Sequence, residues 1–339
     1  MKLTVTRPAA AVAAATLCLV LGACSQLQSA ATGKSEGDGP RQLLLGHGAA
    51  PGNPRTVAAD AFAQEVKDKT SGRITVQVQG SEQLGSDTQM LQSVRAGTLD
   101  LSANSQGPLS ASVPEAALIG LPFLFDDSET AYKVLDGPVG DQLAALAEKQ
   151  GIKVLAWWDN GIRNITNNKR PITSPKDVAG LKIRTPDDPM TVDIFKALGA
   201  NPTPLAFGEL YLALRQGTVD GQENPLTNIA SAKLNEVQKY LAMTGHKYES
   251  TPFVMSLKTW NSLSAKDQKV VQQAADDARD KQRRLMQEQD KQLQTELAKT
   301  MKITTPDKEP FRQATASVYD TWSKKYPELV KALQDAAQG

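Results

Sequence analysis

Cysteine and histidine are scarce in this sequence, which has two of each among its 339 residues. Cys18 and Cys24 both fall within the first 24 residues, so we expect neither a disulfide nor a cysteine-bound metal in the mature chain. His47 and His246 stand far apart, and neither lies in a metal-binding spacing such as HExxH. The sequence therefore predicts that the protein has no metal and no other cofactor.

An excess of charge of either sign is also missing. Lysine and arginine number 38 and aspartate and glutamate 37, which gives a formal net charge of +1. No run of basic residues is interleaved with aromatic residues, so we expect no binding of nucleic acid. A GxSxG motif is absent as well, and the scattered serines suggest turns and helix caps. Triads can form from distant residues, so an enzyme remains an alternative, but the sequence favours a protein that is not an enzyme.

Long apolar runs are confined to the N-terminus. Two basic residues precede an apolar stretch at residues 9–20, which has the length of a signal-peptide core and is too short to span a membrane. The stretch ends in Leu-Gly-Ala-Cys at residues 21–24, which resembles a bacterial lipobox. We therefore expect residues 1–23 to be a lipoprotein signal peptide and Cys24 to carry the lipid, with ordinary secretory cleavage as the alternative. Residues 24–40 lack periodicity and predict a flexible tether.

Beyond the tether, strand and helix patterns alternate. Short apolar or alternating runs indicate strands, and apolar residues three or four apart indicate helices. The strand patterns lie at residues 41–45, 74–78 and 99–103, and the helix patterns lie around 58–66 and at 87–96. This β-α-β-α-β order predicts an α/β fold with a largely parallel sheet. In such sheets, ligands bind beyond the carboxyl ends of the strands.

The rest of the chain continues the alternation and then becomes helical. Helix patterns cover residues 128–135, 139–149, 190–198 and 207–216, and strand patterns cover 152–158 and 251–257. Residues 159–161 form an Asp-Asn-Gly turn signal, at which we expect the chain to cross into a second domain. From residue 264 to 299 one helical pattern runs without glycine or proline, a length of roughly 50 Å. A coiled coil is the alternative there, but the apolar face is rich in alanine and interrupted by glutamines.

Arg184 is the ligand-binding candidate that the local sequence favours most. It ends a short strand pattern at residues 180–186, and the residue after it precedes a proline, which disfavours a helix. An arginine at a strand end is well placed to present its planar guanidinium to a carboxylate, with a surface ion pair as the alternative. Three further candidates are chosen because they lie at or just after the ends of strand patterns: His47, Asn104 and Trp158.

Several stretches around Arg184 resemble a known family. They read "NGIRN" at residues 160–164, "GLKIRTP" at 180–186 and "FGELYLALRQGTVDGQENP" at 207–225. The chain resembles the DctP-type solute-binding proteins, which are the receptors of tripartite ATP-independent periplasmic (TRAP) transporters. The last stretch is highly specific for that family. The likeness covers nearly all of the chain past the leader and weakens in the C-terminal fifth.

The resemblance implies a fold and a set of ligand contacts. It implies a two-domain α/β clamshell like that of periplasmic binding proteins, in which a long helix spans and braces both domains. It makes Arg184 the arginine that binds the ligand carboxylate, Arg163 a second arginine that faces the ligand, and Asn224 a contact of the same carboxylate. Some members of the family carry an acidic ligand contact at the position of Asn104, so we expect this pocket to differ there.

Domain bounds and a function follow from the same resemblance. We place the first ligand-binding domain at residues 41–160 plus 250–289, and the second at 161–249 plus 290–339. We expect a monomeric extracytoplasmic receptor, anchored to the cell membrane by lipid, that binds an organic acid anion and delivers it to the permease subunits of a TRAP transporter. A ligand-sensing subunit of a signalling system is the alternative role.

The candidate residues also suggest the class of acid. Apart from the two arginines, they are richer in hydrogen-bonding groups than in positive charge, and Trp158 adds an aromatic face. Such a set suits a sugar acid, for example a uronate or an aldonate. The second carboxylate of a short dicarboxylate would need another cation, and Arg163 is the only other cationic candidate. A C4-dicarboxylate or a 2-keto acid is the alternative ligand.

Overall fold

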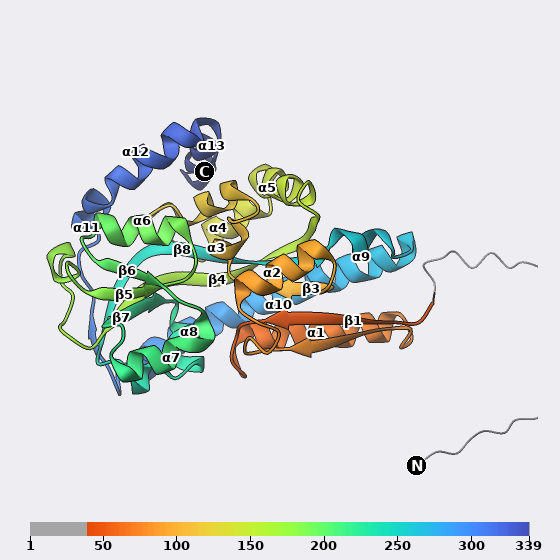
Figure 1. The fold of residues 1–339 in the computed structure, drawn as a ribbon, viewed down its shortest axis with the longest axis horizontal. Coiled ribbons are helices and arrows are strands. Elements are labelled where there is room, and N and C mark those ends of the chain that lie inside the picture. Colours follow the sequence, from red (N-terminus) through yellow and green to blue (C-terminus); the bar gives the residue numbers. More distant parts are fainter. Residues whose placement is uncertain (1–38, 339) are drawn as a thin grey trace, which may run out of the picture. The chain divides into compact units, whose positions relative to one another are not determined.

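A nine-stranded sheet runs through the whole of the described structure. The computed structural model describes residues 39–338, so the expected signal peptide, Cys24 and nearly all of the expected tether lie outside the described residues (Figure 1). The strand order is β2-β1-β3-β8-β4-β7-β5-β6, and β9 pairs with β8. The strands are β1 Arg41–His47, β2 Ile74–Gln79, β3 Leu101–Ala103, β4 Ile152–Asn167, β5 Lys182–Thr185, β6 Asn201–Pro204, β7 Gly221–Asn224, β8 Tyr240–Ser256 and β9 Lys302–Thr304.

The sheet is mixed. At one end β1 pairs in parallel with β2 and β3, and at the other end β5 pairs in parallel with β6 and β7. The centre is antiparallel, because β8 pairs with β3 and β4, and β4 pairs with β7. The expectation of a largely parallel sheet is therefore right for the two ends and wrong for the centre, where two long strands run in opposite directions.

The described residues contain thirteen α-helices, most of which pack on the sheet, while α12 and α13 pack on other helices. They are α1 Pro54–Lys69, α2 Asp87–Ala96, α3 Gln106–Leu109, α4 Ser128–Leu135, α5 Pro138–Glu148, α6 Pro189–Ala197, α7 Phe207–Gln216, α8 Leu226–Ser231, α9 Leu257–Asn261, α10 Ala265–Leu297, α11 Glu309–Ala314, α12 Ala316–Lys325 and α13 Pro327–Gln338. Short 3₁₀ helices span Pro114–Gly120, Pro175–Asp177 and Leu234–Glu236. The predicted helices and strands are all present, because each rests on strong apolar periodicity. No helix within residues 39–338 is both long and apolar enough to cross a membrane.

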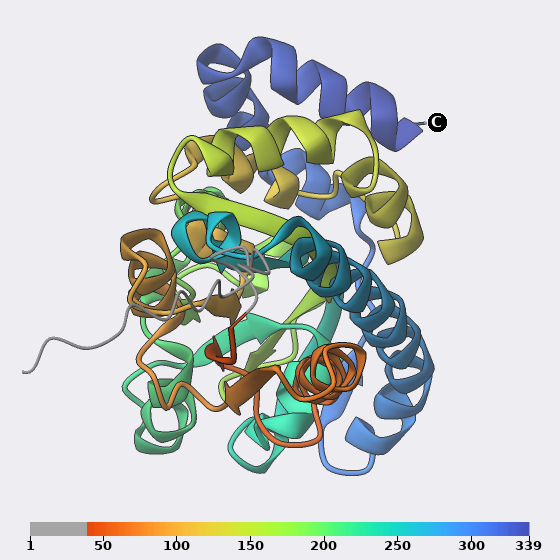
Figure 2. The ribbon, with the colours of Figure 1, turned by 90° about the vertical axis from the view of Figure 1, so that its right-hand side faces the viewer.

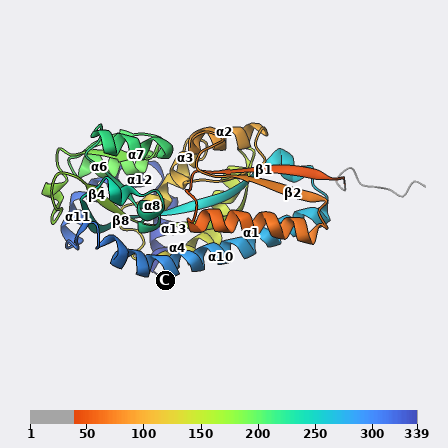
Figure 3. The ribbon, with the colours of Figure 1, turned by 90° about the horizontal axis from the view of Figure 1, so that it is seen from below.

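The two central strands join two lobes. One lobe holds β1, β2 and β3 with α1 and α2, and the other holds β5, β6 and β7 with α6, α7 and α8 (Figures 1 and 3). β4 and β8 pair along most of their 16 and 17 residues and pass through both lobes. This agrees with the expected two-domain clamshell, while the exact domain bounds given above stay a prediction.

The turn expected at residues 159–161 is wrong. β4 continues through this segment, and its pairing with β8 shifts register between Asp159 and Gly161, as in a β-bulge. Gly161 has φ of 112°, which side chains rarely tolerate. An added Cβ would also lie 3.1 Å from Pro225 and 3.3 Å from Met286. Asn-Gly favours a turn where no neighbouring strand is available. Here β4 continues to pair with the buried strand β8 on both sides of these residues.

Helix α10 crosses the back of both lobes. Its 33 residues begin after Ser264, whose side chain caps the first turn, and they pack in succession on α1, β4 and α8 (Figures 2 and 3). The buried face carries alanines that let the helix lie close to the sheet. Packing on the rest of the chain, and not a coiled coil, therefore accounts for the long helical pattern.

Helix α10 is also hydrogen-bonded to the bulge of β4. Gln282 is fully buried; its Oε1 accepts from the backbone N of Asp159 at 2.9 Å, and its Nε2 donates to the backbone O of Asp159 at 2.7 Å. One amide thus satisfies both main-chain groups where the ladder with β8 is interrupted. The helix is fixed to the point at which the two lobes meet.

Replacing Gln282 with Ala should leave both main-chain groups of Asp159 buried without a partner. We expect the free energy of unfolding to fall by about 2–4 kcal/mol, measured by urea denaturation. Gln273→Ala, on the exposed face of the same helix, is the matched control and should change stability by less than about 0.5 kcal/mol. Equal stability of the two variants would show that the hydrogen bonds of Gln282 do not stabilise the bulge.

Candidate ligand-binding site

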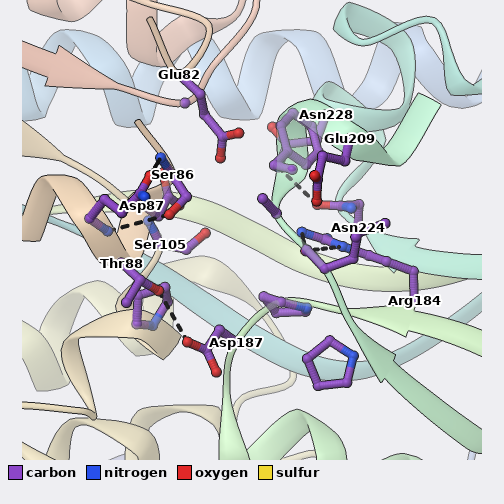
Figure 4. A pocket seen from close by; sticks show the side chains of 18 of the residues that line it. Glu82, Ser86, Asp87, Thr88, Ser105, Arg184, Asp187, Glu209, Asn224 and Asn228 are labelled. Carbon is purple, nitrogen blue, oxygen red and sulfur yellow. Dashed lines mark hydrogen bonds between the residues drawn. The ribbon is translucent and has the colours of Figure 1, made fainter. Parts of the chain in front are cut away.

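A pocket of about 480 Å³ opens between the two lobes. Its size is that of a site for a small molecule. The loops after β1 and β2, helix α2 and the segment around Ser105 line it from one lobe, and the ends of β5 and β7 and the start of α7 line it from the other (Figure 4). Ligands are therefore expected beyond the carboxyl ends of these strands, as the sequence analysis predicted.

Arg184 lies at the end of β5 with its guanidinium in the pocket lining. It is 3% exposed, and its Nε and Nη2 both donate to the backbone O of Leu205, at 2.9 and 2.7 Å. Its guanidinium lies 5.7 Å from the ring centre of Phe207. No carboxylate of residues 39–338 lies within ion-pair distance of it, so the alternative of a surface ion pair is not what the structure shows. Burial lowers the pKa of Arg184 to about 10.

Arg163, in the middle of β4, is paired on every side. Its Nε contacts the carboxylate of Glu223 and its Nη1 contacts that of Glu249, while Nη2 donates to Oε1 and to the backbone O of Glu223, each at 2.7 Å. Burial would lower the pKa of Arg163, but the two carboxylates outweigh it and raise that pKa. Arg163 reaches the pocket lining, yet its charge is already balanced. Its role as a second ligand-facing arginine stays a prediction.

The ion pairs of Arg163 belong to a larger buried network at the junction of the lobes. Burial would raise the pKa of Glu223, but Arg163 and a hydrogen bond from His246 hold it at about 2. Lys247 contacts the carboxylate of Asp188 and lies 3.6 Å from Glu249. Breaking one pair in such a network leaves an unpaired charge away from water, so the network fixes the strands that carry it.

Asn224 ends β7 beside Arg184 (Figure 4). Its Oδ1 accepts from Nδ2 of Asn228 at 3.1 Å, and its Nδ2 donates to Oε1 of Gln222 at 2.5 Å. An amide nitrogen carries two hydrogens, so the second one remains for a ligand. Asn224 and Arg184 thus line the same pocket with donor groups, while their contact with a ligand carboxylate stays a prediction.

The opposite wall of the pocket is acidic. Glu82 and Asp87 lie across the pocket from Arg184 in Figure 4, whereas Asp187 and Glu209, which also line the pocket, belong to the lobe of Arg184. Burial raises the pKa of Asp87 to about 6, and its Oδ2 accepts from the backbone N of Ser105 at 3.1 Å. These carboxylates were not among the candidates from sequence, because single acidic residues in loops carry no distinctive pattern.

Three sequence candidates do not line the pocket. Trp158 stacks on Phe253 with ring centres 4.5 Å apart inside the core under α1. His47 is fully buried, and its Nδ1 accepts from the backbone N of Ala49 at 3.2 Å. Asn104 is buried behind Asp87, to whose Oδ1 its amide donates at 2.8 Å in the orientation that satisfies both groups. Position near a strand end is thus a weak guide, because successive side chains of a strand point to opposite faces.

Arg55 is a pocket residue that the sequence analysis missed. It lies in the first turn of α1, after the capping residue Asn53, and it is 5% exposed. An arginine that directly follows Asn-Pro suggests only a helix start, so the sequence contained no signal for its place in the site. Within residues 39–338 no cluster of histidine, cysteine and acidic residues suits a metal ion.

Comparison with known proteins identifies the family. The model of the bacterial extracellular solute-binding protein family 7, DctP, matches residues 45–325. The chain belongs to this family. An uncharacterised protein of Sinorhizobium fredii is 52% identical over 87% of this chain, although the match spans only 54% of that relative.

Two solved structures show what proteins of this fold hold. A TRAP periplasmic solute-binding protein from a Polaromonas species, bound to D-erythronate, is 40% identical, with a TM-score of 0.84 over 86% of this chain and 98% of that one. One from Sulfurospirillum deleyianum, with bound succinate, is 33% identical, with a TM-score of 0.84 over 87% of this chain and 99% of that one. The matching structures are TRAP periplasmic solute-binding proteins with a two-domain fold, so the expected fold and family are confirmed.

Burial of His47 should make stability depend on pH. Burial, helped by the charge of Arg55, lowers the pKa of His47 from 6.5 to about 4. The unfolded chain therefore binds more protons between these values, and stability falls as the pH falls from 6.5 to 4, by roughly 3 kcal/mol from this group. In His47→Asn the amide oxygen replaces Nδ1 as acceptor and does not titrate. We expect urea denaturation at pH 7 and pH 4.5 to show a smaller loss for the variant; parallel losses would refute a neutral, buried His47.

Proposed function

We propose that this chain is an extracytoplasmic receptor that binds a polyhydroxylated monocarboxylate, a sugar acid, and delivers it to the permease of a TRAP transporter. The observation that carries the proposal is the contrast between the two walls of one pocket. One wall has Arg184, which is buried without a carboxylate at ion-pair distance, and the other has Glu82 and Asp87, whose carboxylate oxygens can accept hydrogen bonds, together with Arg55. The two ligands in the structures compared above, a sugar acid and a dicarboxylate, differ in class. The ligand class of this chain is therefore inferred from the residues that line its own pocket.

The ligand carboxylate is proposed to bind at Arg184. Leu205 occupies Nε and one hydrogen of Nη2, which leaves the end of the guanidinium, Nη1 and the other hydrogen of Nη2, to face a carboxylate with two parallel hydrogen bonds. The remaining amide hydrogen of Asn224 adds a third donor. Because the charge of Arg184 is desolvated whether or not a ligand is bound, an anion there gains most of the pairing energy without a further desolvation cost for the protein.

The acidic wall favours hydroxyl groups at the far end of the ligand. A hydroxyl donates to the carboxylate of Asp87 or Glu82, whereas a second ligand carboxylate would meet like charge in a partly desolvated site. This argument favours an aldonate or uronate over a C4-dicarboxylate. His47, Asn104 and Trp158 do not line the pocket, so the preference for a sugar acid rests on Glu82 and Asp87 instead.

Ligand binding is proposed to close the lobes. Hydrogen bonds already join the lobes around the pocket. Oε2 of Glu82 accepts from the backbone N of Gly208 at 2.7 Å, Thr88 pairs with Asp187 at 3.2 Å, and Asn53 donates to Asn228 at 3.0 Å and to Ser231 at 3.2 Å. A Cβ on Gly208 would lie 2.6 Å from Oε2 of Glu82, so glycine permits this approach. A ligand that bridges Arg184 and Asp87 adds contacts only in the closed form and shifts the population toward it. The permease then receives the ligand unchanged, without catalysis.

A calorimetric ligand panel tests the proposal. Wild-type protein should bind at least one of D-erythronate, D-galactonate and D-glucuronate more tightly than succinate, malate or pyruvate, by about tenfold or more. Arg184→Ala should weaken binding of the preferred acid by about 2–5 kcal/mol, because the carboxylate loses its partner, and Arg184→Lys should restore only part of it. Tight binding of succinate with no response to any sugar acid would contradict the ligand class. Unchanged affinity of a folded Arg184→Ala variant would remove Arg184 from the site.

A lipid anchor on Cys24 and a signal peptide at residues 1–23 complete the proposal. Support for them comes from the sequence alone, since these residues lie outside the described part of the chain. Wild-type protein should incorporate labelled palmitate, and Cys24→Ser should not, while its soluble part still binds the ligand. Absence of label from the wild type would contradict the anchor.

A receptor that signals instead of transporting would have the same pocket. Permease genes beside the gene of this protein, and loss of uptake when they are deleted, would support transport over signalling.

A further inference from the structure

Arg55 is the second arginine of the pocket that lacks a carboxylate within ion-pair distance among residues 39–338. It lies in the first turn of α1, so it belongs to the lobe opposite Arg184. The function proposed above does not use it. An arginine that is 5% exposed and faces a ligand pocket needs acceptors for its five donor hydrogens, whatever balances its charge.

The protein satisfies only part of the guanidinium of Arg55. Nη2 donates to Oδ1 of Asn160 at 2.9 Å and to Oγ1 of Thr251 at 2.8 Å. Nη1 reaches the backbone O of Ala103 at 3.5 Å, the outer limit of a hydrogen bond. Within the described residues Nε has no hydrogen-bond partner. Nη2 is therefore held in place, while the hydrogen of Nε and at least one hydrogen of Nη1 have no strong partner among residues 39–338.

A chain of amides connects Arg55 to the proposed carboxylate contact. Oδ1 of Asn160, which accepts from Arg55, also accepts from Nδ2 of Asn228 at 3.1 Å. The same Nδ2 donates to Oδ1 of Asn224 at 3.1 Å. Arg55 thus approaches the pocket beside the end of the ligand that carries the carboxylate, from the lobe opposite Arg184.

The surroundings of Arg55 favour a neutral acceptor over a second carboxylate. Burial lowers the pKa of Arg55, while the charges of Asp87 and Glu249 oppose this, so acidic groups stand near enough to balance part of its charge. A second ligand carboxylate at this point would feel the same two acidic groups as repulsion. A hydroxyl oxygen accepts from Arg55 and can pass its own hydrogen to an acidic neighbour such as Asp87.

We propose that Arg55 is a specificity-determining residue that donates hydrogen bonds to the oxygen on the carbon next to the ligand carboxylate. The inference rests on the proposed function and narrows it: the ligand is an open-chain 2-hydroxy sugar acid, an aldonate. Arg184 holds the carboxylate from one lobe, and Arg55 holds the neighbouring oxygen from the other lobe. The first two carbons of the ligand then connect the lobes directly.

Two matched pairs of acids test this assignment. D-Erythronate is compared with 3,4-dihydroxybutanoate, and D-galactonate with 2-deoxy-D-galactonate, so each pair differs only in the 2-hydroxyl group. Wild-type protein should bind the hydroxylated member of at least one pair about 10- to 100-fold more tightly in calorimetry. Arg55→Met should weaken binding of that acid by a similar factor and leave the affinity for its deoxy counterpart within about threefold of wild type, because only one hydrogen-bonded contact is lost.

Controls separate this contact from a general effect. Arg279→Met, on α10 away from the pocket lining, should leave all affinities unchanged, and Arg55→Lys, which keeps the charge and one donor direction, should recover part of the discrimination. Circular dichroism and thermal melting establish that each variant is folded. If Arg55→Met is unstable, the affinity ratio within each pair is read from Arg55→Lys and Arg55→Gln.

The outcomes distinguish this inference from the function on which it rests. An equal loss for both members of a pair, or no loss for either, would overturn the assignment of Arg55 while the receptor function stands. Binding of uronates with no affinity for an aldonate would also overturn it. If wild-type protein binds no sugar acid at all, the proposed ligand class falls, and this inference falls with it.

Discussion

The cost of burying a charged guanidinium without a carboxylate is the constraint on which the site depends. Arg163 meets that constraint inside the protein, because Glu223 and Glu249 surround it at the junction of the lobes. Arg184 has no such carboxylate partner, and its guanidinium contacts only the backbone O of Leu205 and the ring of Phe207 among the groups described above. The fold has to supply the free energy to keep Arg184 desolvated, which the buried network and the close packing of β4, β8 and α10 provide. A ligand anion then pairs with a charge that is already in place.

The same packing explains how the site can open and close. β4 and β8 run through both lobes, and the bulge at Asp159 and Gly161 interrupts their ladder where the lobes meet. Gln282 of α10 pairs with both main-chain groups of Asp159 at that point, so the main chain stays hydrogen-bonded where the ladder is interrupted. The contacts between the lobes at the pocket rim are few and polar, which suits a closure that ligand binding controls.

Much of the fold could be predicted from sequence because its elements have strong periodicity. Helices α2 and α7 begin and end where the pattern predicts, and Asp188 caps α6 as its place before Pro189 indicates. The continuation of β4 through Asn160 and Gly161 could not be predicted, since pairing with β8, nearly a hundred residues away, overrides the local turn signal. Tertiary context decided the element there.

The residues of the site could be predicted only in part from the sequence, for related reasons. Arg184, Arg163 and Asn224 reach the pocket, and a specific family motif pointed to each of them. Trp158 lies inside β4 and packs in the core, and His47 ends β1 but is fully buried. Successive side chains of a strand point to opposite faces, and the sequence does not say which face is the pocket. Arg55, Asp87 and Glu82 come from loops and first helical turns, where no periodicity marks a position. The sequence thus indicated the pocket residues that the family motif contains, and it did not indicate those on the opposite lobe.

A crystal structure with a bound aldonate tests the central claim most directly. Crystals grown with saturating D-erythronate or D-galactonate should show the ligand carboxylate against Nη1 and Nη2 of Arg184 and the amide of Asn224, with hydroxyl groups toward Asp87 and Glu82. A carboxylate bound elsewhere in the pocket, or an acid whose hydroxyl groups face Arg184, would contradict the account of a cation-lined wall for the acid and an acidic wall for the hydroxyls.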